Sequence, residues 1–194
     1  MLKGAMAELS MGNPGLLSTD VGPVIDDASK QTLQDHYDRM TKEGELLYQV
    51  SVPSDAGHFF GPCAFEIDSA KRLEREVFGP FLHVIRFKVG DLGRVVEEIN
   101  ATGYGLTLGV HSRIQHVAEE VFNATIAGNT YINRNMIGAV VGVQPFGGAG
   151  LSGTGPKAGG PHYLYRLCSE RTLSVNTTAA GGNASLLILE EGDS

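Results

Sequence analysis

The stretch that decides the fold is FLHVIRFKVGDLGRVVEEINATGYGLTLGVHSRIQHVAEEVFNATIAGNTYIN, residues 81–133. Apolar runs at 81–87, 107–111 and 128–133 predict three strands. Between them lie two stretches whose apolar residues recur at the i, i+3, i+4 and i+7 spacing of a helix that faces a core. Strand, helix, strand, helix and strand with short connections predict a mostly parallel sheet with flanking helices, which is an α/β fold.

Each of the two predicted helices has one apolar face. The first face comprises Leu92, Val95, Val96 and Ile99, and the second comprises Ile114, Val117, Ala118, Val121 and Phe122. Ser112 and Gln115 stand three residues apart in front of the second face, and this spacing predicts a capping box that begins the helix.

Shorter elements are predicted on either side of this stretch. Residues 26–43 have the spacing of a helix with Leu33, Tyr37 and Met40 on one side, and residues 46–52 read as a short strand. Residues 1–11 read as the end of a helix that has no start signal, which suggests that the natural protein continues upstream. A short helix is expected at 161–167.

The C-terminal tail differs in character from the rest of the chain. The run Ser-Leu-Leu-Ile-Leu-Glu at 185–190 predicts a single strand with no partner nearby in the sequence. An unpaired strand exposes backbone N–H and C=O groups, so we expect it to add to another sheet, such as that of a neighbouring subunit. We therefore divide the chain into a globular part, residues 1–170, and a tail for oligomerisation or docking, residues 171–194.

Composition and charge narrow the class of protein. A net charge of −7 without a basic run argues against nucleic-acid binding, and small molecules are the expected partners. No apolar stretch is long enough to span a bilayer, and the N-terminus has no secretory signal pattern. Cys63 and Cys168 form neither a metal-ligand spacing nor a disulfide framework, and neither has a context that would stabilise a thiolate. These features predict a cytoplasmic protein.

The first motif that carries chemistry is Glu76-Val-Phe-Gly-Pro80, directly before the strand predicted at 81–87. A carboxylate at Glu76 accepts hydrogen bonds from two hydroxyl groups of a ribose, and an aromatic ring at Phe78 packs against a flat heterocycle. The alternative is that Glu76 is a solvated charge and Phe78 a core residue. The pentapeptide alone favours this alternative.

Two glycine-rich motifs follow the last predicted strand. Pro145-Phe-Gly-Gly148 lies where ligands bind in open α/β sheets, although a loop that simply returns to the sheet fits equally well. Gly159 and Gly160 precede Pro161 and a predicted helix start. Free N–H groups at such a point suit a carboxylate, and the alternative is an ordinary Gly-Gly-Pro turn.

In their order along the chain, these motifs resemble the C-terminal half of the aldehyde dehydrogenase superfamily, and the match extends over nearly the whole chain. Glu76-Val-Phe-Gly-Pro80 resembles the nicotinamide-side signature, Tyr104-Gly-Leu-Thr107 the strand entry, and Pro145-Phe-Gly-Gly148 the pocket loop. The resemblance implies that residues 1–170 are part of an aldehyde dehydrogenase catalytic domain.

Other stretches narrow the resemblance within this superfamily. GLSGTGPKAGGPHY at 150–163 is similar to the Δ1-pyrroline-5-carboxylate (glutamate-semialdehyde) dehydrogenases. GNTYINRN at 128–135 and VGVQPFGG at 141–148 resemble stretches of the bifunctional proline utilisation A proteins. The implied reaction is thiolate attack on glutamate semialdehyde, hydride transfer to NAD and thioester hydrolysis to glutamate. In a bifunctional protein, FAD would belong to a proline dehydrogenase half that these residues do not include.

The resemblance also implies a role for individual residues. Glu76 would bind the hydroxyls of the nicotinamide ribose, and Phe78 would support the nicotinamide ring. Phe146 would line the aldehyde pocket. The N–H groups of Gly159 and Gly160 would bind the α-carboxylate of the substrate. Leu167 would supply an apolar wall.

One departure from the family is large. The nucleophile of the superfamily lies in a Gly-Gln-x-Cys segment, and neither this segment nor the one with the hydrolytic glutamate occurs in the chain. We therefore expect a fragment that has no catalytic residue and is inactive alone, with the nucleotide-binding domain upstream. The choice between NAD and NADP stays open, because the adenosine-ribose contacts also lie upstream. The alternative is a stand-alone, non-catalytic module that binds a partner through its tail strand.

Overall fold

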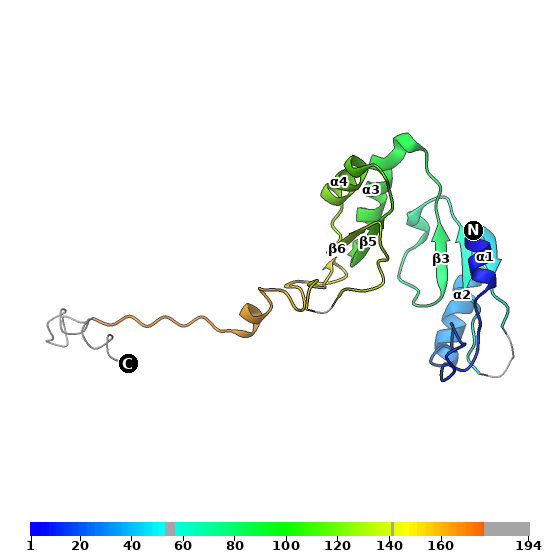
Figure 1. Cartoon of the computed structure of the whole chain (residues 1–194), viewed down its shortest axis with the longest axis horizontal. Coiled ribbons are helices and arrows are strands. Elements are labelled where there is room, and N and C mark those ends of the chain that lie inside the picture. The colour runs from blue at the N-terminus through cyan, green and yellow to red at the C-terminus, as the bar shows by residue number, and fades with distance from the viewer. Residues whose placement is uncertain (53–56, 141, 177–194) are drawn as a thin grey trace.

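The computed structural model describes residues 1–52, 57–140 and 142–176. Figure 1 shows two lobes, one with α1, α2 and β3 and the other with α3, α4, β5 and β6, followed by loops and an extended segment that leaves the body. Among the described residues, no helix combines the length and the apolar character needed to cross a membrane.

The first lobe is a three-stranded sheet covered by a long helix. The sheet contains β1 (Glu45–Gln49), β2 (Cys63–Glu66) and β3 (Phe81–Val84), with β1 and β2 antiparallel and β2 and β3 parallel. α2 (Asp27–Glu43) packs on it through a core cluster. The buried members of this cluster are Leu33, Met40, Phe60, Cys63, Phe65 and Ile67.

Local sequence determines both ends of α2. The Asp26 side chain accepts a hydrogen bond from the N–H of Ser29 at 2.7 Å and so caps the first turn. The helix ends before Gly44, where a Cβ would lie only 2.7 Å from the carbonyl oxygen of Glu66, so only glycine lets the chain pass this closely to β2. The predicted helix at 26–43 is confirmed to within one residue.

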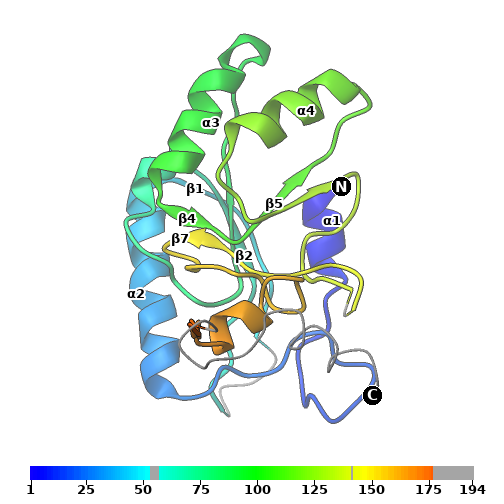
Figure 2. The ribbon, with the colours of Figure 1, turned by 90° about the vertical axis from the view of Figure 1, so that its left-hand side faces the viewer.

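The second lobe is a β-α-β unit with an additional helix. β5 (Thr107–Val110) and β6 (Asn129–Ile132) pair in parallel, and α4 (Gln115–Ala124) connects them. α3 (Leu92–Ala101) precedes this unit and buries Val96. The short strands β4 (Tyr104–Gly105) and β7 (Ala149–Gly150) pair antiparallel and lie side by side in Figure 2.

The α/β class is confirmed, but the prediction of one sheet was wrong for the described strands. β3 pairs with β2 instead of β5, so the strands form three small sheets in place of a single one. The sequence pattern did not predict β2. Cys63, Ala64 and Phe65 are at most 1% exposed, and this central strand pairs with one edge of β3 and places β3 at the outer edge of the first sheet. An apolar run of this length has no readable periodicity.

The predicted capping box was also wrong. The hydroxyl of Ser112 accepts a hydrogen bond from the N–H of Ile114 at 3.0 Å, and the Gln115 side chain donates to Glu119 instead of returning to Ser112. α4 therefore begins two residues later than the box required, with Ile114 as its N-cap in place of Ser112. Two residues of its predicted buried face are exposed, Ile114 at 63% and Phe122 at 56%.

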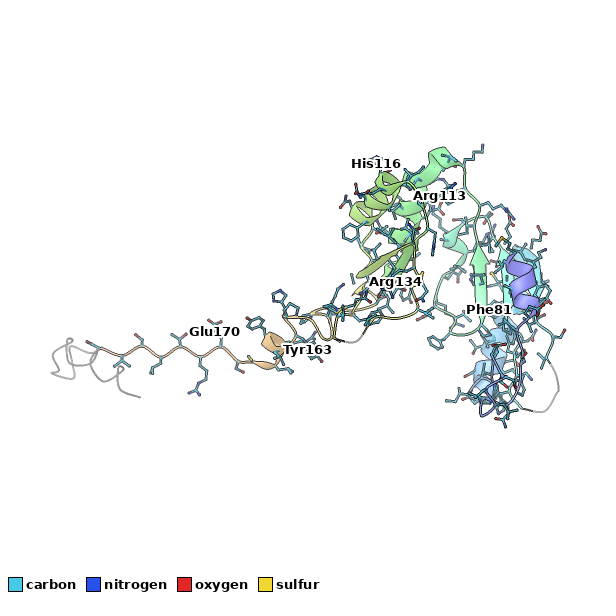
Figure 3. All side chains as sticks on the ribbon, viewed as in Figure 1. Phe81, Arg113, His116, Arg134, Tyr163 and Glu170 are labelled. Carbon is cyan, nitrogen blue, oxygen red and sulfur yellow. The ribbon has the colours of Figure 1, made fainter. Side chains whose placement is uncertain are left out.

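The ends of the described chain are less regular than predicted. The first helix, α1, covers only Leu2–Ala7, and the helix expected at 161–167 is a single 3₁₀ turn, η3 (Leu164–Leu167). All residues of 161–176 are exposed, and Tyr163 and Glu170 mark this segment in Figure 3. The strand predicted at 185–190 lies outside the described residues.

Candidate functional site

A cavity of about 570 Å³ lies between the two lobes. It is bordered by the loop before β3, by β3, by the end of α3 and by residues 104–108. Its polar lining includes Glu76, His83, Tyr104 and Ser152. Such a volume is in the range of small-ligand pockets. Of the predicted site residues, Glu76 lines this cavity.

The loop that carries Glu76 is held from beneath by apolar packing. Val77 packs against the core cluster, and a Cβ at Gly79 would collide with the Leu33 side chain. Glu76 itself is exposed, and within the described part of the chain its carboxylate has no hydrogen-bond or ion-pair partner. Phe78 is 91% exposed. A carboxylate and an aromatic face that are both available fit the ribose and the ring of a nicotinamide nucleotide.

A pair of histidines borders the same cavity. His36 Nε2 and His83 Nε2 lie 3.0 Å apart, and Arg39 Nη2 lies 3.5 Å from His36 Nδ1. A guanidinium only donates, so His36 Nδ1 accepts and the proton of the neutral His36 ring is on Nε2, which donates to His83. Burial lowers the pKa of His36 to about 4, assisted by the charges of His83, Arg39 and Arg75. The sequence gives no sign of this pair, because its members are 47 residues apart.

The two glycine-rich motifs meet away from this cavity. Phe146 and Ala158 form an isolated antiparallel bridge, in which each N–H donates to the other carbonyl at 3.0 Å. Gly159 follows directly, with a φ of +70° that favours glycine. The N–H of Gly160 donates to the carbonyl oxygen of Lys157 at 3.0 Å, so it closes a turn in this structure.

The remaining predicted substrate residue lies further along the chain. Leu167 is in η3 and is 73% exposed, so in the described chain its side chain is open to solvent. The structure therefore brings Phe146 and Gly159 together, and places Leu167 on the exposed segment. Their roles toward a ligand stay predictions.

A comparison with protein-family models resolves the family. The model described as the aldehyde dehydrogenase family matches residues 1–173. The chain belongs to the aldehyde dehydrogenase family. This match includes all the predicted site residues, from Glu76 to Leu167.

Among curated relatives, the chain is similar to two kinds of protein. It is 55% identical over 178 residues to the bifunctional protein PutA of Klebsiella aerogenes, covering 88% of this chain and 14% of that protein. It is 38% identical over 170 residues to a 1-pyrroline-5-carboxylate dehydrogenase of Geobacillus sp. (strain WCH70), covering 86% of this chain and 32% of that protein. The chain thus spans between about a seventh and a third of the length of these relatives.

Solved structures agree with these similarities. A crystal structure of a mutant proline utilization A (PutA) from Bradyrhizobium japonicum matches with a TM-score of 0.87 and 54% identity, over 93% of this chain and 18% of that chain. A 1-pyrroline-5-carboxylate dehydrogenase from Thermus with bound NAD matches with a TM-score of 0.75 and 37% identity, over 84% of this chain and 31% of that chain.

Neither cysteine of this aldehyde dehydrogenase chain has the setting of a nucleophile. Cys63 is 1% exposed in the central strand β2, and burial raises the pKa of its thiol to about 12. Cys168 is exposed, and its Sγ donates to the carbonyl oxygen of Leu164 at 3.3 Å. A nucleophilic thiolate is stabilised by a nearby positive charge, a helix N-terminus or a metal, and Cys63 has the opposite environment. In the part of the chain that the structure describes, no cluster of three metal-ligating side chains occurs.

Proposed function

We propose that this chain forms part of an NAD-dependent dehydrogenase that oxidises glutamate semialdehyde, the open form of pyrroline-5-carboxylate, to glutamate in proline catabolism. The observation that carries the proposal is the similarity to PutA and to 1-pyrroline-5-carboxylate dehydrogenases across the segment that contains every predicted site residue. The chain supplies contacts to the cofactor and to the substrate, and the bond-breaking groups belong to other segments.

Glu76 and Phe78 form the cofactor side of the proposal. The unpartnered carboxylate of Glu76 accepts hydrogen bonds from the two hydroxyls of the nicotinamide ribose, and the exposed ring of Phe78 supports the nicotinamide. When bound, NAD accepts the hydride from the aldehyde carbon. The Thermus relative that was crystallised with NAD supports this choice of cofactor.

Phe146 and the Gly159–Gly160 pair form the substrate side. Phe146 lines the apolar path of the semialdehyde, and backbone N–H groups near Gly159 bind its α-carboxylate, with Leu167 as a further apolar wall. The Gly160 N–H, which closes a turn on Lys157 here, has to rotate out of that bond before it donates to a carboxylate. The carboxylate supplies a stronger acceptor than a carbonyl oxygen does.

The nucleophile comes from a segment other than these 194 residues, because Cys63 is buried with a raised pKa and Cys168 is engaged with a carbonyl oxygen. NADH formation from pyrroline-5-carboxylate tests the proposal. The complete reading frame that contains this chain is expected to produce NADH, whereas the 194 residues alone are expected to produce none. Turnover by the short chain would refute its dependence on another segment, and an inactive complete protein would refute the reaction.

A second candidate function is that of a stand-alone module that binds a partner, either another protein or a second copy of this chain. It is favoured by the exposed apolar side chains of the segment after the glycine-rich loops. These are Tyr163, Leu164, Tyr165, Leu167, Leu173 and Val175. The mass of the native protein separates the two candidates, since the module requires a protein of 20.6 kDa subunits and the dehydrogenase requires longer ones.

A further inference from the structure

Asn129, at the start of β6, is the hydrogen-bonding centre of the substrate loops. It is 9% exposed, and both the oxygen and the nitrogen of its side-chain amide are hydrogen-bonded. Its Oδ1 accepts from the N–H of Gly147 at 3.1 Å, and its Nδ2 donates to the carbonyl oxygen of Pro145 at 3.0 Å. These two partners flank Phe146 on either side, so the amide holds the backbone of the pocket loop at two points.

The second substrate loop is fastened at the same place. The ammonium group of Lys157 donates to the carbonyl oxygen of Gly128, the residue before Asn129. Ala158 then pairs with Phe146 through two backbone hydrogen bonds of 3.0 Å, and Gly159 follows. The loop with Phe146 and the loop with Gly159 are therefore joined at one bridge, and each is attached separately to the first residues of β6, the first by Asn129 and the second by Lys157.

This attachment leaves little freedom. At Gly128 a Cβ would collide with the carbonyl oxygen of Gly147, and at Gly148 a Cβ would lie 2.5 Å from the carbonyl oxygen of Ser152. Close backbone packing of this kind carries any shift at Asn129 into the loops. A neutral amide donates to one backbone group and accepts from another at the same time, which neither a carboxylate nor an ammonium group does.

We propose that Asn129 is a positioning residue that sets the separation between Phe146 and Gly159, and thereby selects aldehydes that carry a carboxylate. This inference rests on the proposed function. An aldehyde with a carboxylate contacts both loops at once, so its binding depends on their relative position. An uncharged aldehyde contacts only the loop of Phe146, and it tolerates a displaced Gly159.

The test compares two substrates in the complete dehydrogenase that contains this chain. Asn129→Leu removes both hydrogen bonds while it keeps the γ-branched shape of the side chain, and Asn129→Ser keeps a hydroxyl able to make one of them. For Asn129→Leu we expect the KM for glutamate semialdehyde to rise about tenfold, because two buried hydrogen bonds that position the loop are lost. The KM of Asn129→Ser is expected to lie between the values of Asn129→Leu and the native protein. The kcat, the KM for NAD and the kcat/KM for pentanal are expected to change by less than about threefold.

Asn133, at the other end of β6, provides a matched control. Its Oδ1 accepts from the N–H of Ser112 at 2.9 Å, and its Nδ2 donates to the carbonyl oxygen of Ser112 at 2.8 Å. Like Asn129, it therefore accepts one hydrogen bond from the backbone and donates one to it, but to a residue outside the substrate loops. Asn133→Ala is expected to lower thermal stability without a change in the ratio of kcat/KM for the two aldehydes.

The outcomes separate this inference from the proposed function. A native protein that does not oxidise glutamate semialdehyde refutes the proposed function. A native protein that does, with Asn129 variants that lose both aldehydes equally or neither, refutes only the positioning role. If Asn129→Leu does not fold, Asn129→Ser alone decides by the same ratio.

Discussion

The loop before β3 and the loops after β6 carry the two sides of the proposed site, and they are held by opposite means. The first rests on apolar packing of Val77 and of Gly79 over the core cluster, while Glu76 and Phe78 face outward. The second is held by polar contacts from the start of β6. The first loop would contact the cofactor through its side chains, so a substitution at Glu76 tests its role directly. The second loop would contact the substrate through backbone N–H groups, so its role has to be tested by substituting the residues that hold it in place.

The largest expected effect comes from removing the support of the first loop. Leu33 of α2 is completely buried and packs against Gly79, so Leu33→Ala is expected to leave a cavity and to lower the free energy of unfolding by about 2–5 kcal/mol. Urea unfolding measures this loss. Leu173→Ala, at a site 88% exposed, is the control and should stay within about 0.5 kcal/mol of the native protein. A Leu33 variant as stable as this control would mean that packing does not hold the loop.

A comparable test of the second loop is Gly128→Ala. The added Cβ meets the carbonyl oxygen of Gly147 and lies 2.9 Å from the Cα of Gly148, both of which are backbone atoms that cannot rotate away. We expect a loss of about 3 kcal/mol, the upper end for overpacking, in the same unfolding measurement. Gly138→Ala serves as the matched variant, because nothing lies within 4 Å of a Cβ there. Equal stability of the two variants would contradict a tightly packed loop.

A smaller effect, confined to activity, is expected at Glu76. Glu76→Gln replaces a charged acceptor by a neutral amide and should lower kcat/KM for NAD by about 10- to 100-fold, with the unfolding transition unchanged. Steady-state kinetics of the complete dehydrogenase measure it. Glu74→Gln, an exposed carboxylate two residues earlier in the same loop, should retain native kinetics. Similar losses in both variants would show a general electrostatic effect and not a ribose contact.

The same contrast explains how much the sequence could predict. α2, α3 and the β5-α4-β6 unit were predictable because each has either a cap or a sustained apolar spacing over a sufficient length. β2 was not, because its buried residues Cys63, Ala64 and Phe65 give no period, and β3 was consequently assigned to the wrong neighbour. Local patterns do not encode the partner of a short buried strand.

The candidate site divides in the same way. Glu76 was predicted from its motif and does line the cavity, since an acidic and an aromatic residue before a strand are visible in a linear sequence. Asn129 was missed, because its partners are 16 and 18 residues away and an asparagine inside an apolar strand signals nothing by itself. Supports of a backbone site are long-range contacts, so they appear only once the chain is folded.

The last prediction concerns the histidine pair at the cavity, whose effect on stability is expected only at acidic pH. An unfolded histidine titrates near 6.5, whereas burial and the neighbouring His83, Arg39 and Arg75 lower the pKa of His36 to about 4. As the pH falls, the unfolded chain therefore binds the proton first. The stability present above pH 6.5 is lost progressively as the pH approaches 4.

Thermal midpoints of the native protein and of His36→Gln, measured across this range, test that prediction. The variant is expected to lose stability less steeply than the native protein. Its thermal midpoint should still decrease somewhat as the pH falls, because burial and Arg39 also lower the pKa of His83. His116→Gln, at an exposed position on α4, should follow the native curve. Parallel curves for His36→Gln and the native protein would mean that protonation of His36 does not reduce stability in this pH range.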